Sequence, residues 1–329
     1  MKKIAVVILN WNGVQLLEQF LPSVVQFSPE AVIYVADNAS TDDSVAFVKA
    51  NFPTVRIIQN STNYGFAQGY NEALQHIDAD IYALVNSDIE VTANWLQPIL
   101  NTFEKDRDTA IIQPKLLDFK NKDYFEYAGA AGGFIDKYGY PYCRGRVFDT
   151  VEKDLGQYDN NCEISWASGA CFFIRSSVYK ELGGFDEIFF AHQEEIDLCW
   201  RATNKGYKIK YQHDSTVYHV GGATLQQGNP KKTYLNFRNS LLMLSKNLPK
   251  NKLFPILFTR MILDGLAGIQ FILQGKAAHF TAILKAHYSF YTLLSVTYKK
   301  RSNFQSETYY STKSIVYQYY VNSGKIFVK

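Results

Sequence analysis

Short apolar runs alternate with amphipathic stretches through the first part of the chain, and this alternation constrains the fold more than any other feature. The apolar runs have the length of strands and cover residues 4–9, 31–36, 55–59 and 81–85. Between them, apolar residues recur at helical spacing over residues 14–27, from Ser40-Thr41 to Ala50, and over residues 65–77. Strands that alternate with helices in this way form a mostly parallel sheet covered on both faces. The sequence therefore predicts an α/β, Rossmann-like domain.

Polar and small residues follow each of these expected strands. They are Asn10-Trp11-Asn12, Asp37-Asn38, the stretch from Asn60 to Asn63, and Asn86-Ser87-Asp88. Open α/β sheets bind their ligands outside the carboxyl ends of the strands. We therefore expect a ligand site at this edge of the sheet.

The periodicity fails between residues 118 and 161, where Gly, Tyr, Asp and basic residues dominate. This composition predicts long loops with a lid or binding role rather than an element of the core. Regular structure is expected again as a strand over residues 164–175, a helix over residues 194–205 and a strand over residues 207–211. Three further helices are expected over residues 233–247, 253–273 and 276–294.

Charge is distributed unevenly along the chain, although the net charge is only +3. The residues up to Leu225 include 19 basic and 29 acidic side chains. The residues after it include 15 basic side chains and only two acidic ones, Asp264 and Glu307. Two regions with different surroundings explain such polarity. We therefore expect one α/β domain over residues 1–225 and a helical, basic and aromatic region over residues 226–329.

Several classes of protein do not fit the composition. Cys143, Cys162, Cys171 and Cys199 form no CxxC pair, which argues against a zinc ribbon or a disulfide scaffold and fits a reducing compartment. The apolar run after the initial Met-Lys-Lys is too short for a signal peptide, and no uninterrupted apolar run has the roughly 18 residues of a simple membrane span. The absence of GxGxxG, GxxxxGK[ST] and GxSxG motifs argues against a dinucleotide cofactor, a P-loop and a hydrolase nucleophile elbow.

Carboxylates and one histidine remain as candidates for chemistry. Asp37 can accept the imino N–H of uracil or thymine, or it can cap the turn that follows its strand. Asn63, Gly65, Gly69 and Asn71 form a loop that enters a helix, where backbone N–H groups attract an anion or simply close a turn. Both interpretations of both features are open from the residues alone.

Asp88 and His219 are candidate ligands of a divalent cation. A Mg²⁺ ion commonly takes one or two carboxylates together with phosphate oxygens, and Asp88 follows a strongly apolar strand. His219 lies in the segment Tyr218-His219-Val220-Gly221-Gly222, and a single histidine after a strand has a structural role as readily as a ligand role.

The densest acidic cluster of the chain is Glu194-Glu195-Ile196-Asp197. Carboxylates are common at helix N-termini because the helix dipole favours negative charge there. A carboxylate in this position can alternatively act as a general base that takes a proton from an attacking hydroxyl.

Read in order, these segments resemble the family 2 glycosyltransferases, which have a GT-A fold, and within them the bacterial rhamnosyltransferase-like branch. The likeness extends over roughly the first 225 residues, and the segment 233–244 with Arg238-Asn239 is similar to the extension of this branch. The matching segments are Val6-Val7-Ile8-Leu9-Asn10-Trp11-Asn12, Val35-Ala36-Asp37-Asn38-Ala39-Ser40-Thr41-Asp42, Asn63-Tyr64-Gly65-Phe66-Ala67-Gln68-Gly69-Tyr70-Asn71, Asn86-Ser87-Asp88, Gly183-Gly184-Phe185-Asp186-Glu187, Glu194-Glu195-Ile196-Asp197-Leu198-Cys199-Trp200-Arg201 and His219-Val220-Gly221-Gly222.

The resemblance implies a function and a role for each motif. Asp88 and His219 are implied to hold a Mg²⁺ or Mn²⁺ ion and the diphosphate, and the second acid of the acidic pair is implied to be the base. That acid is Glu195 where the family has Asp, so the choice between Glu194 and Glu195 is open and we favour Glu195. The nucleotide sugar is expected to contact Asn10, Asn12, Asp37, Asn63, Gly65, Asn71, Asn86 and Asp88. The acceptor or the diphosphate is expected to contact Trp166, Asp197 and Arg238.

The expected activity is inverting transfer of a sugar, with rhamnose as a candidate, from a nucleoside-diphosphate sugar to a hydroxyl of a cell-surface glycan or a lipid-linked acceptor. One rival is a nucleotidyltransferase, which would need a Gly-rich basic loop after the first strand. Another is an inactive scaffold that binds nucleotide sugars, since the Asp-x-Asp motif is reduced to Asn86-Ser87-Asp88.

The basic C-terminal helices admit two interpretations. The helix over residues 253–273 has Thr259, Arg260, Asp264 and Gln270 on one side, and Arg260 and Asp264 can pair at a spacing of i,i+4. Such a helix can be buried against its neighbours, or it can lie in the surface of an anionic membrane. The expected location is cytoplasmic, with peripheral contact to the cytoplasmic face of the membrane as the second interpretation. No nucleic acid is expected as a partner, because no recognition module accompanies the charge.

Overall fold

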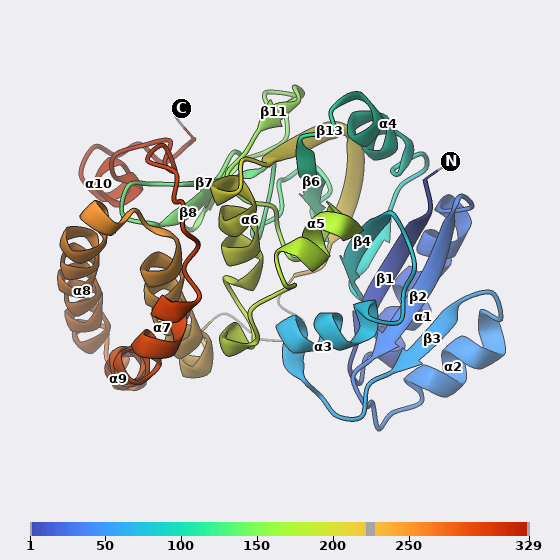
Figure 1. Ribbon diagram of the computed structural model, residues 1–329, viewed down its shortest axis with the longest axis horizontal. Helices are drawn as coiled ribbons and strands as arrows, with labels where there is room; N and C mark the ends of the chain where they lie inside the picture. The colour runs from blue at the N-terminus through green and yellow to red at the C-terminus, as the bar shows by residue number, and fades with distance from the viewer. Residues whose placement is uncertain (1, 222–227, 328–329) are drawn as a thin grey trace.

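The computed structural model describes residues 2–221 and 228–327 of the chain. A mixed sheet flanked by helices forms its main body, and the helices after residue 228 lie at the end of the molecule away from α2 and β3 (Figure 1). In the described residues the main sheet has nine strands in the order β11-β13-β6-β12-β4-β1-β2-β3, with β5 paired to β13. The expected α/β fold with a helical C-terminal extension is therefore confirmed.

The first four long strands run parallel and agree with the expected runs to within one residue at each end. Their carboxyl ends are level, since β1 pairs in register with both neighbours: Asn10 lies opposite Asp37, and Leu9 lies opposite Asn86. Polar residues from three strands therefore meet at one edge of the sheet, as predicted. The strands are β1 (Ile4–Asn10), β2 (Ala31–Asp37), β3 (Arg56–Gln59) and β4 (Ile81–Asn86).

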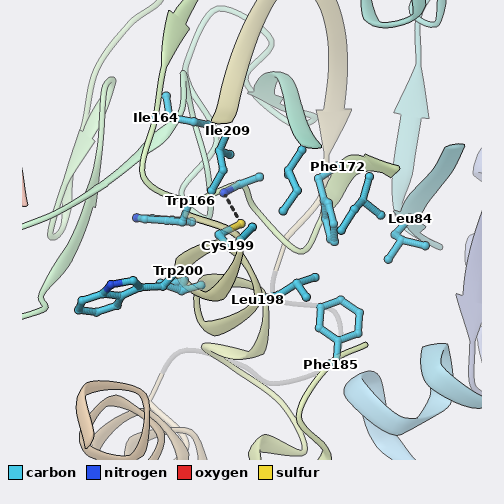
Figure 2. Close-up of a cluster of buried hydrophobic side chains, with 14 of the residues drawn as sticks. Leu84, Ile164, Trp166, Phe172, Phe185, Leu198, Cys199, Trp200 and Ile209 are labelled. Carbon is cyan, nitrogen blue, oxygen red and sulfur yellow. Dashed lines mark hydrogen bonds between the residues drawn. The ribbon is translucent and has the colours of Figure 1, made fainter. Parts of the chain in front are cut away.

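Helices cover both faces of the sheet because the residues of its central strands alternate between two cores. Ile4, Val6 and Ile8 of β1 pack in one core with α1 and α4. Ala5 and Val7 point into the other core, which includes α3, α5, α6 and aromatic side chains of the later strands (Figure 2). The helices are α1 (Val14–Phe27), α2 (Ser44–Asn51), α3 (Gly65–Leu74), α4 (Gln97–Lys105), α5 (Ser176–Glu181) and α6 (Glu194–Asn204).

The second half of the sheet differs from the expected pattern. β12 (Cys171–Arg175) runs antiparallel between β4 and β6 (Thr109–Asp118), so the expected strand over residues 164–175 was too long. β13 (Lys208–His219) continues eight residues beyond the expected end at residue 211, because it pairs with β6 as far as Asp118. β6 itself was not predicted, since buried Gln113 and Lys115 interrupt its apolar pattern. The short strands β5 (Ile89–Val91) and β11 (Cys162–Glu163) both pair with β13.

The prediction of loops outside the core for residues 118–161 was wrong. This segment forms a second, four-stranded sheet and supplies the buried side chains of Phe125, Phe134 and Tyr142 to the main core. Its polar residues are also buried, with Arg144 and Arg146 bonded to backbone carbonyls, so its composition concealed its burial. The strands are β7 (Gly133–Ile135), β8 (Pro141–Cys143), β9 (Arg146–Val147) and β10 (Thr150–Val151).

The three expected C-terminal helices are present, and a short fourth helix follows them. They are α7 (Pro230–Asn247), α8 (Lys250–Leu273), α9 (Ala277–Lys299) and α10 (Ile315–Tyr320). Leu241, Leu242 and Leu244 of α7 are fully buried in the main core. The expected domain boundary at residue 225 lies outside the described residues.

Helix α8 alone, among the residues described, is long and apolar enough to cross a membrane by length and composition, although no simple span was expected. Its two central charges, Arg260 and Asp264, are buried and face each other at 3.8 Å within the helical region, as their i,i+4 spacing predicted. One side of α8 is thus packed against the rest of the protein.

Candidate functional site

Asp37 closes the turn after β2 and is fully buried. Its Oδ1 atom accepts a hydrogen bond from Asn10 Nδ2 at 3.0 Å, and its Oδ2 atom accepts one from the Ser40 backbone N–H at 2.9 Å. The turn-capping interpretation of Asp37 is therefore realised, and its contact with a nucleobase stays a prediction. Helix α2 begins at Ser44 rather than near Ser40, since the Ser40 hydroxyl oxygen is occupied by Asn10 and Asn12.

Asn12 extends this cluster to the surface. It adopts a left-handed backbone conformation with φ 49°, and its Oδ1 atom accepts a hydrogen bond from the Thr41 N–H at 2.7 Å. Gly13 leaves no room for a side chain, because a Cβ atom there would lie 2.5 Å from Asn10 Oδ1 and 3.8 Å from Ser87 Oγ. The ends of β1, β2 and β4 are thus in direct contact.

The loop that enters α3 packs on the segment before α6. Gly65 has φ +74°, and a Cβ atom there would lie 2.8 Å from the Phe190 ring. Asn63 Oδ1 accepts the Gly65 N–H at 3.0 Å, so turn chemistry explains this asparagine. Gly69 lies against the Asn38 amide, at 2.6 Å from the position of a Cβ atom.

Asn71 faces away from the strand ends and joins α3 to the Gly183-Gly184-Phe185 segment. Its Oδ1 atom accepts hydrogen bonds from the Phe185 N–H and the Tyr179 hydroxyl, and its Nδ2 atom donates to the Phe185 carbonyl. These bonds give the side chain a structural role, and the expected contact of Asn71 with the nucleotide sugar stays a prediction.

His219 lies between two buried carboxylates. Its Nε2 atom is 3.1 Å from Asp88 Oδ1, and its Nδ1 atom is 3.1 Å from Glu126 Oε1. Burial alone would lower the pKa of His219, but Glu126 and Asp88 raise it to about 10. The expected pair of Asp88 and His219 therefore exists, and a third member, Glu126, was missed because it belongs to the segment expected to form loops.

The same cluster limits what can hold a metal ion. Across residues 2–221 and 228–327, no three His, Cys, Asp or Glu side chains are grouped so as to hold a metal ion. Asp88 and His219 nevertheless present two donor atoms close enough to bind one cation together. Glu126 then lies 3.1 Å from the other ring nitrogen, the position that carboxylates take behind histidine ligands of metals. Gly222, which ends the motif after His219, lies outside the described residues.

Glu194 and Glu195 occupy the first turn of α6, and no cation of the described residues lies in ion-pair range of them. Burial raises the pKa of Glu195 to about 7, against backbone N–H groups that lower it. Burial and the adjacent Glu195 raise the pKa of Glu194 well above its usual range. Only Glu195 is partly exposed, whereas Glu194 is 4% exposed.

Glu195 is connected to the strand ends through residues 169–170. A Cβ atom on Gly169 would lie 3.7 Å from Glu195 Cδ, and the neighbouring Ala170 carbonyl accepts the Asn86 N–H at 2.9 Å. Asn86, Asp88 and Glu195 therefore lie along one continuous edge with Asn10 and Asp37. Gly169 and its small neighbour Ser168 were visible in the sequence as a Ser-Gly pair inside an apolar run, but no role was assigned to them.

Asp197 lies on another side of α6 and is fully buried in an ionic cluster. Its carboxylate contacts Arg201 Nε at 2.8 Å, Lys246 Nζ at 2.9 Å and Asn247 Nδ2 at 2.8 Å. Burial acts to raise its pKa, but Lys246 and Arg201 outweigh burial and lower it. These contacts give Asp197 a structural role, and its expected contact with the acceptor or the diphosphate stays a prediction.

Trp166 and Arg238 also form hydrogen bonds within the protein. The Trp166 indole is buried on Gly133 and donates to the Phe134 carbonyl at 2.9 Å. Arg238 donates to the carbonyls of Ile188 and Phe189 at 2.9 and 3.1 Å. Both side chains thus have partners within the protein, and their expected contacts with an acceptor or a diphosphate stay predictions.

Arg238 and its neighbour Asn239 instead hold the loop that leads into α6. Asn239 Nδ2 lies within 3.0 Å of the carbonyl oxygens of Phe189, Ala191 and His192. Phe190, His192 and Gln193 in this loop all have positive φ angles between 64° and 73°, a conformation that costs about 1 kcal/mol or more per residue. Hydrogen bonds from α7 therefore stabilise the strained approach to Glu194 and Glu195.

Comparisons with known proteins agree with this geometry. The family model described as "Glycosyl transferase family 2" matches residues 5–183. The chain is 24% identical over 222 residues to the N-acetylglucosaminyl-diphospho-decaprenol L-rhamnosyltransferase of Mycobacterium tuberculosis, a match that covers 62% of this chain and 71% of that protein. It is 22% identical to the low-salt glycan biosynthesis hexosyltransferase Agl10 of Haloferax volcanii, covering 73% of this chain and 74% of that protein.

Solved structures share the fold. GalNAc-T7 with UDP, GalNAc and Mn²⁺ matches with a TM-score of 0.60 and 18% identity, over 77% of this chain and 49% of that chain. TarS 1-349 of S. aureus in complex with UDP-GlcNAc matches with a TM-score of 0.58 and 15% identity, over 91% of this chain and 84% of that chain.

Proposed function

Because the chain belongs to glycosyl transferase family 2, we propose that it is an inverting hexosyltransferase that uses a nucleoside-diphosphate sugar. The acceptor is a hydroxyl of a cell-surface glycan or of a lipid-linked precursor. Rhamnose is the proposed sugar, because the M. tuberculosis relative is named for rhamnosyl transfer and the sequence motifs resemble that branch.

The observation that carries this proposal is the meeting of two different acidic groups at one edge of the sheet. Glu195, with a pKa of about 7 and no cationic partner, is joined through Gly169 and Ala170 to the end of β4. The Asp88–His219 pair follows that same strand end. A general base beside a group that attracts positive charge is what transfer from a diphosphate leaving group requires.

Glu195 is the proposed base. The acceptor oxygen attacks the anomeric carbon from the face opposite the nucleotide, the bond from that carbon to the diphosphate oxygen breaks, and the hydroxyl proton passes to Glu195. One displacement inverts the configuration. A base works best when its pKa is near the working pH. Glu194 is the weaker candidate, because it is almost fully buried and burial and Glu195 raise its pKa well above the usual range.

Asp88 and His219 would hold a divalent cation, with Glu126 behind the histidine. Such a cation neutralises charge that develops on the leaving diphosphate. The donor set fits this group, because a carboxylate oxygen and an imidazole nitrogen that has lost its proton are both ligands of Mn²⁺, and these two atoms lie 3.1 Å apart. Two solved structures that share this fold, those of GalNAc-T7 and of the mannosyltransferase PcManGT, contain Mn²⁺.

The direct test is Glu195→Gln, which keeps the size of the side chain and removes its basicity. We expect turnover to fall by about 10²–10⁴-fold, the usual contribution of a positioned base. The donor for this assay is found first with a thermal-shift panel of dTDP-rhamnose, UDP-glucose, UDP-GlcNAc and GDP-mannose, because a ligand of the native state raises apparent stability. Hydrolysis of the selected donor is then measured with and without Mn²⁺.

Glu104→Gln, on the exposed side of α4, is the matched control and should transfer normally. Near wild-type transfer by a folded Glu195→Gln variant would remove Glu195 from the role of base. Binding of a nucleotide sugar without hydrolysis or transfer by the wild type would favour the inactive scaffold instead.

Location at the cytoplasmic face of a membrane is part of the proposal. Helix α8 meets the length and composition of a membrane-seeking helix, and 15 basic residues follow residue 225. Sedimentation of the full-length chain with anionic vesicles at low salt tests this location, and absence from the pellet would refute it.

A further inference from the structure

The two central charges of helix α8 are buried, whereas large apolar side chains lie on its exposed side. The buried side holds Arg260, which donates to the Tyr138 carbonyl and the Ser240 hydroxyl, and Asp264, which contacts His287 at 3.1 Å. The exposed side carries a stripe at helical spacing. Its members are Phe254, Phe258, Ile262, Leu266, Ile269 and Leu273, with exposed fractions of 52–82%. A continuous apolar surface of this kind on a folded protein marks a binding surface.

A groove lies between α8 and α9 beside this stripe. Its volume is about 590 Å³, and its walls are Leu253, Phe254 and Leu257 of α8 and Tyr291, Leu294 and Tyr298 of α9. The wall residues of α8 extend over about 10 Å from residue 250 to residue 257, at about 1.5 Å per residue. The groove is therefore short and open, and its walls are mostly apolar.

Two lysines mark one end of this groove. Lys250 begins α8, and Lys299 ends α9, so the two lie together where the helical hairpin opens. Neither has a carboxylate within ion-pair distance among the described residues, whereas the adjacent Lys252 and Lys300 pair with Glu307 and Asp186. An apolar trough with two uncommitted ammonium groups at its mouth is complementary to a hydrocarbon chain that ends in a phosphate.

The lysine end of the groove is connected to the candidate site. Lys300 follows Lys299 directly and contacts Asp186 Oδ1 at 2.6 Å. Asp186 begins the segment that runs through the short helix η1 (Glu187–Phe189) into the strained loop before Glu194. A ligand on Lys299 would therefore lie one residue away from Lys300, the side chain that contacts the start of the segment before Glu195.

We propose that the α8–α9 groove binds the hydrocarbon chain and phosphate of a lipid-linked acceptor, with Lys250 and Lys299 on the phosphate. This inference rests on the proposed transfer to a lipid-linked acceptor and names where the lipid part binds. The exposed stripe beside the groove then faces the bilayer from which the lipid enters.

The experiment measures binding of farnesyl phosphate to the full-length chain by calorimetry, below the concentration at which the lipid forms micelles. Farnesol and inorganic phosphate are titrated as partial ligands. We expect farnesyl phosphate to bind at least tenfold more tightly than farnesol, and inorganic phosphate to show no measurable binding. The double variant Lys250→Gln/Lys299→Gln should lose at least tenfold in affinity for farnesyl phosphate, and Leu257→Arg should abolish binding.

Lys285→Gln is the matched control, because Lys285 is exposed on α9 and does not line the groove. Equal affinity in the wild type, the double lysine variant and the control would overturn the proposal, as would equal affinity for farnesol. A concentration-dependent dimer that Leu257→Arg dissociates, without lipid binding, would assign the groove to a second copy of the chain and likewise overturn it.

Failure of the groove and failure of the proposed function give different results. If the groove is correct, the double lysine variant loses transfer to a lipid-linked acceptor but keeps donor hydrolysis, and Glu195→Gln keeps farnesyl phosphate binding. If the wild type binds farnesyl phosphate but neither hydrolyses nor transfers any sugar, the groove stands and the transferase proposal fails.

Discussion

Two sides of helix α6 carry carboxylates in opposite electrostatic surroundings. On the side that faces α7, Asp197 contacts Arg201 and Lys246, and its pKa is lowered although it is fully buried. At the start of the helix, Glu194 and Glu195 have no cationic neighbour in ion-pair range within the part of the chain that the structure describes, and their pKa values are raised. Glu194 is almost as deeply buried as Asp197, at 4% and 0% exposed, yet their pKa values shift in opposite directions, so the placement of cations, and not burial, separates these two acids.

The difference indicates which acids the fold uses for structure and which it leaves for chemistry. Asp186 belongs to the first class as well, since Lys246 and Lys300 outweigh burial and lower its pKa to about 2. Acids that remain without a cation are costly to bury, and such costs cluster at functional sites. This contrast supports Glu195 more strongly than its position in an acidic motif does.

Removal of the shared cation should have the largest effect on stability. Lys246 contacts Asp186 at 2.7 Å and Asp197 at 2.9 Å, and all three side chains are buried. Lys246→Met leaves two buried carboxylates short of a partner, so we expect the free energy of unfolding to fall by about 3–5 kcal/mol. Urea unfolding measures this loss.

Lys205→Met provides the comparison, since Lys205 pairs with Glu181 on the exposed surface and such pairs contribute about 0–1 kcal/mol. Equal losses for the two variants would mean that the cluster on the α7 side of α6 contributes no more than a surface pair.

Glu126 has a feature of each class of acid, so it tests the distinction between structural acids and acids used for chemistry. Glu126 has His219 as its cationic partner, yet we propose that it supports a metal ligand. Glu126→Gln should weaken Mn²⁺ binding by about 10–100-fold, the usual effect of removing a carboxylate behind a histidine ligand. Calorimetric titration of Mn²⁺ in the presence of UDP or dTDP measures the change.

Glu163→Gln on the exposed strand β11 should leave Mn²⁺ affinity unchanged. Wild-type affinity in the Glu126→Gln variant would restrict Glu126 to a structural pair with His219.

The parallel half of the fold could be predicted because its signals are local. Strands β1, β2 and β4 are continuous apolar runs, and parallel pairing then requires that their polar ends meet. Strand β6 and the segment 118–161 could not be predicted in this way. Lys115 is buried there because Asp154 and Asp159 contact it, and these partners are about 40 residues distant in the sequence.

The sequence motifs predicted which segments form the candidate site, but they did not predict where each side chain points. Asp88 and His219 do meet, although 131 residues separate them. Trp166, Asp197 and Arg238 belong to segments with the right motifs, yet each points to a partner inside the protein. Spacing on α6 alone does not tell which acid faces Lys246, because that lysine belongs to a helix that begins 26 residues after α6 ends.

The pH dependence of turnover should follow the ionisation of Glu195. Since burial raises the pKa of Glu195 to about 7 and the base must be ionised, kcat/KM should fall about tenfold per pH unit below that pH. Initial rates between pH 5 and 9 at subsaturating donor measure the profile. Donor binding, followed by thermal shift at each pH, should change little; an inflection below pH 5 with constant donor binding would exclude Glu195 as the titrating base.

The smallest expected effect concerns stability and has opposite signs for the two acids. The folded-state pKa of Glu195 is raised from about 4.5 to about 7, so its contribution is fully present below about pH 4.5 and is lost as the pH rises through 7. At pH 8 the Glu195→Gln variant should therefore be more stable than the wild type and unfold at a higher urea concentration. The expected gain in the free energy of unfolding is about 1 kcal/mol, because Glu195 is partly exposed and shares its environment with Glu194. The pKa of Asp197 is lowered, so its contribution is present at pH 8 and is lost as the pH falls through its folded-state pKa. Asp197→Asn should accordingly be destabilised at pH 8, with the deficit narrowing in acid. If both variants shifted in the same direction at pH 8, cation placement would no longer explain why one helix carries a structural acid and a proposed base.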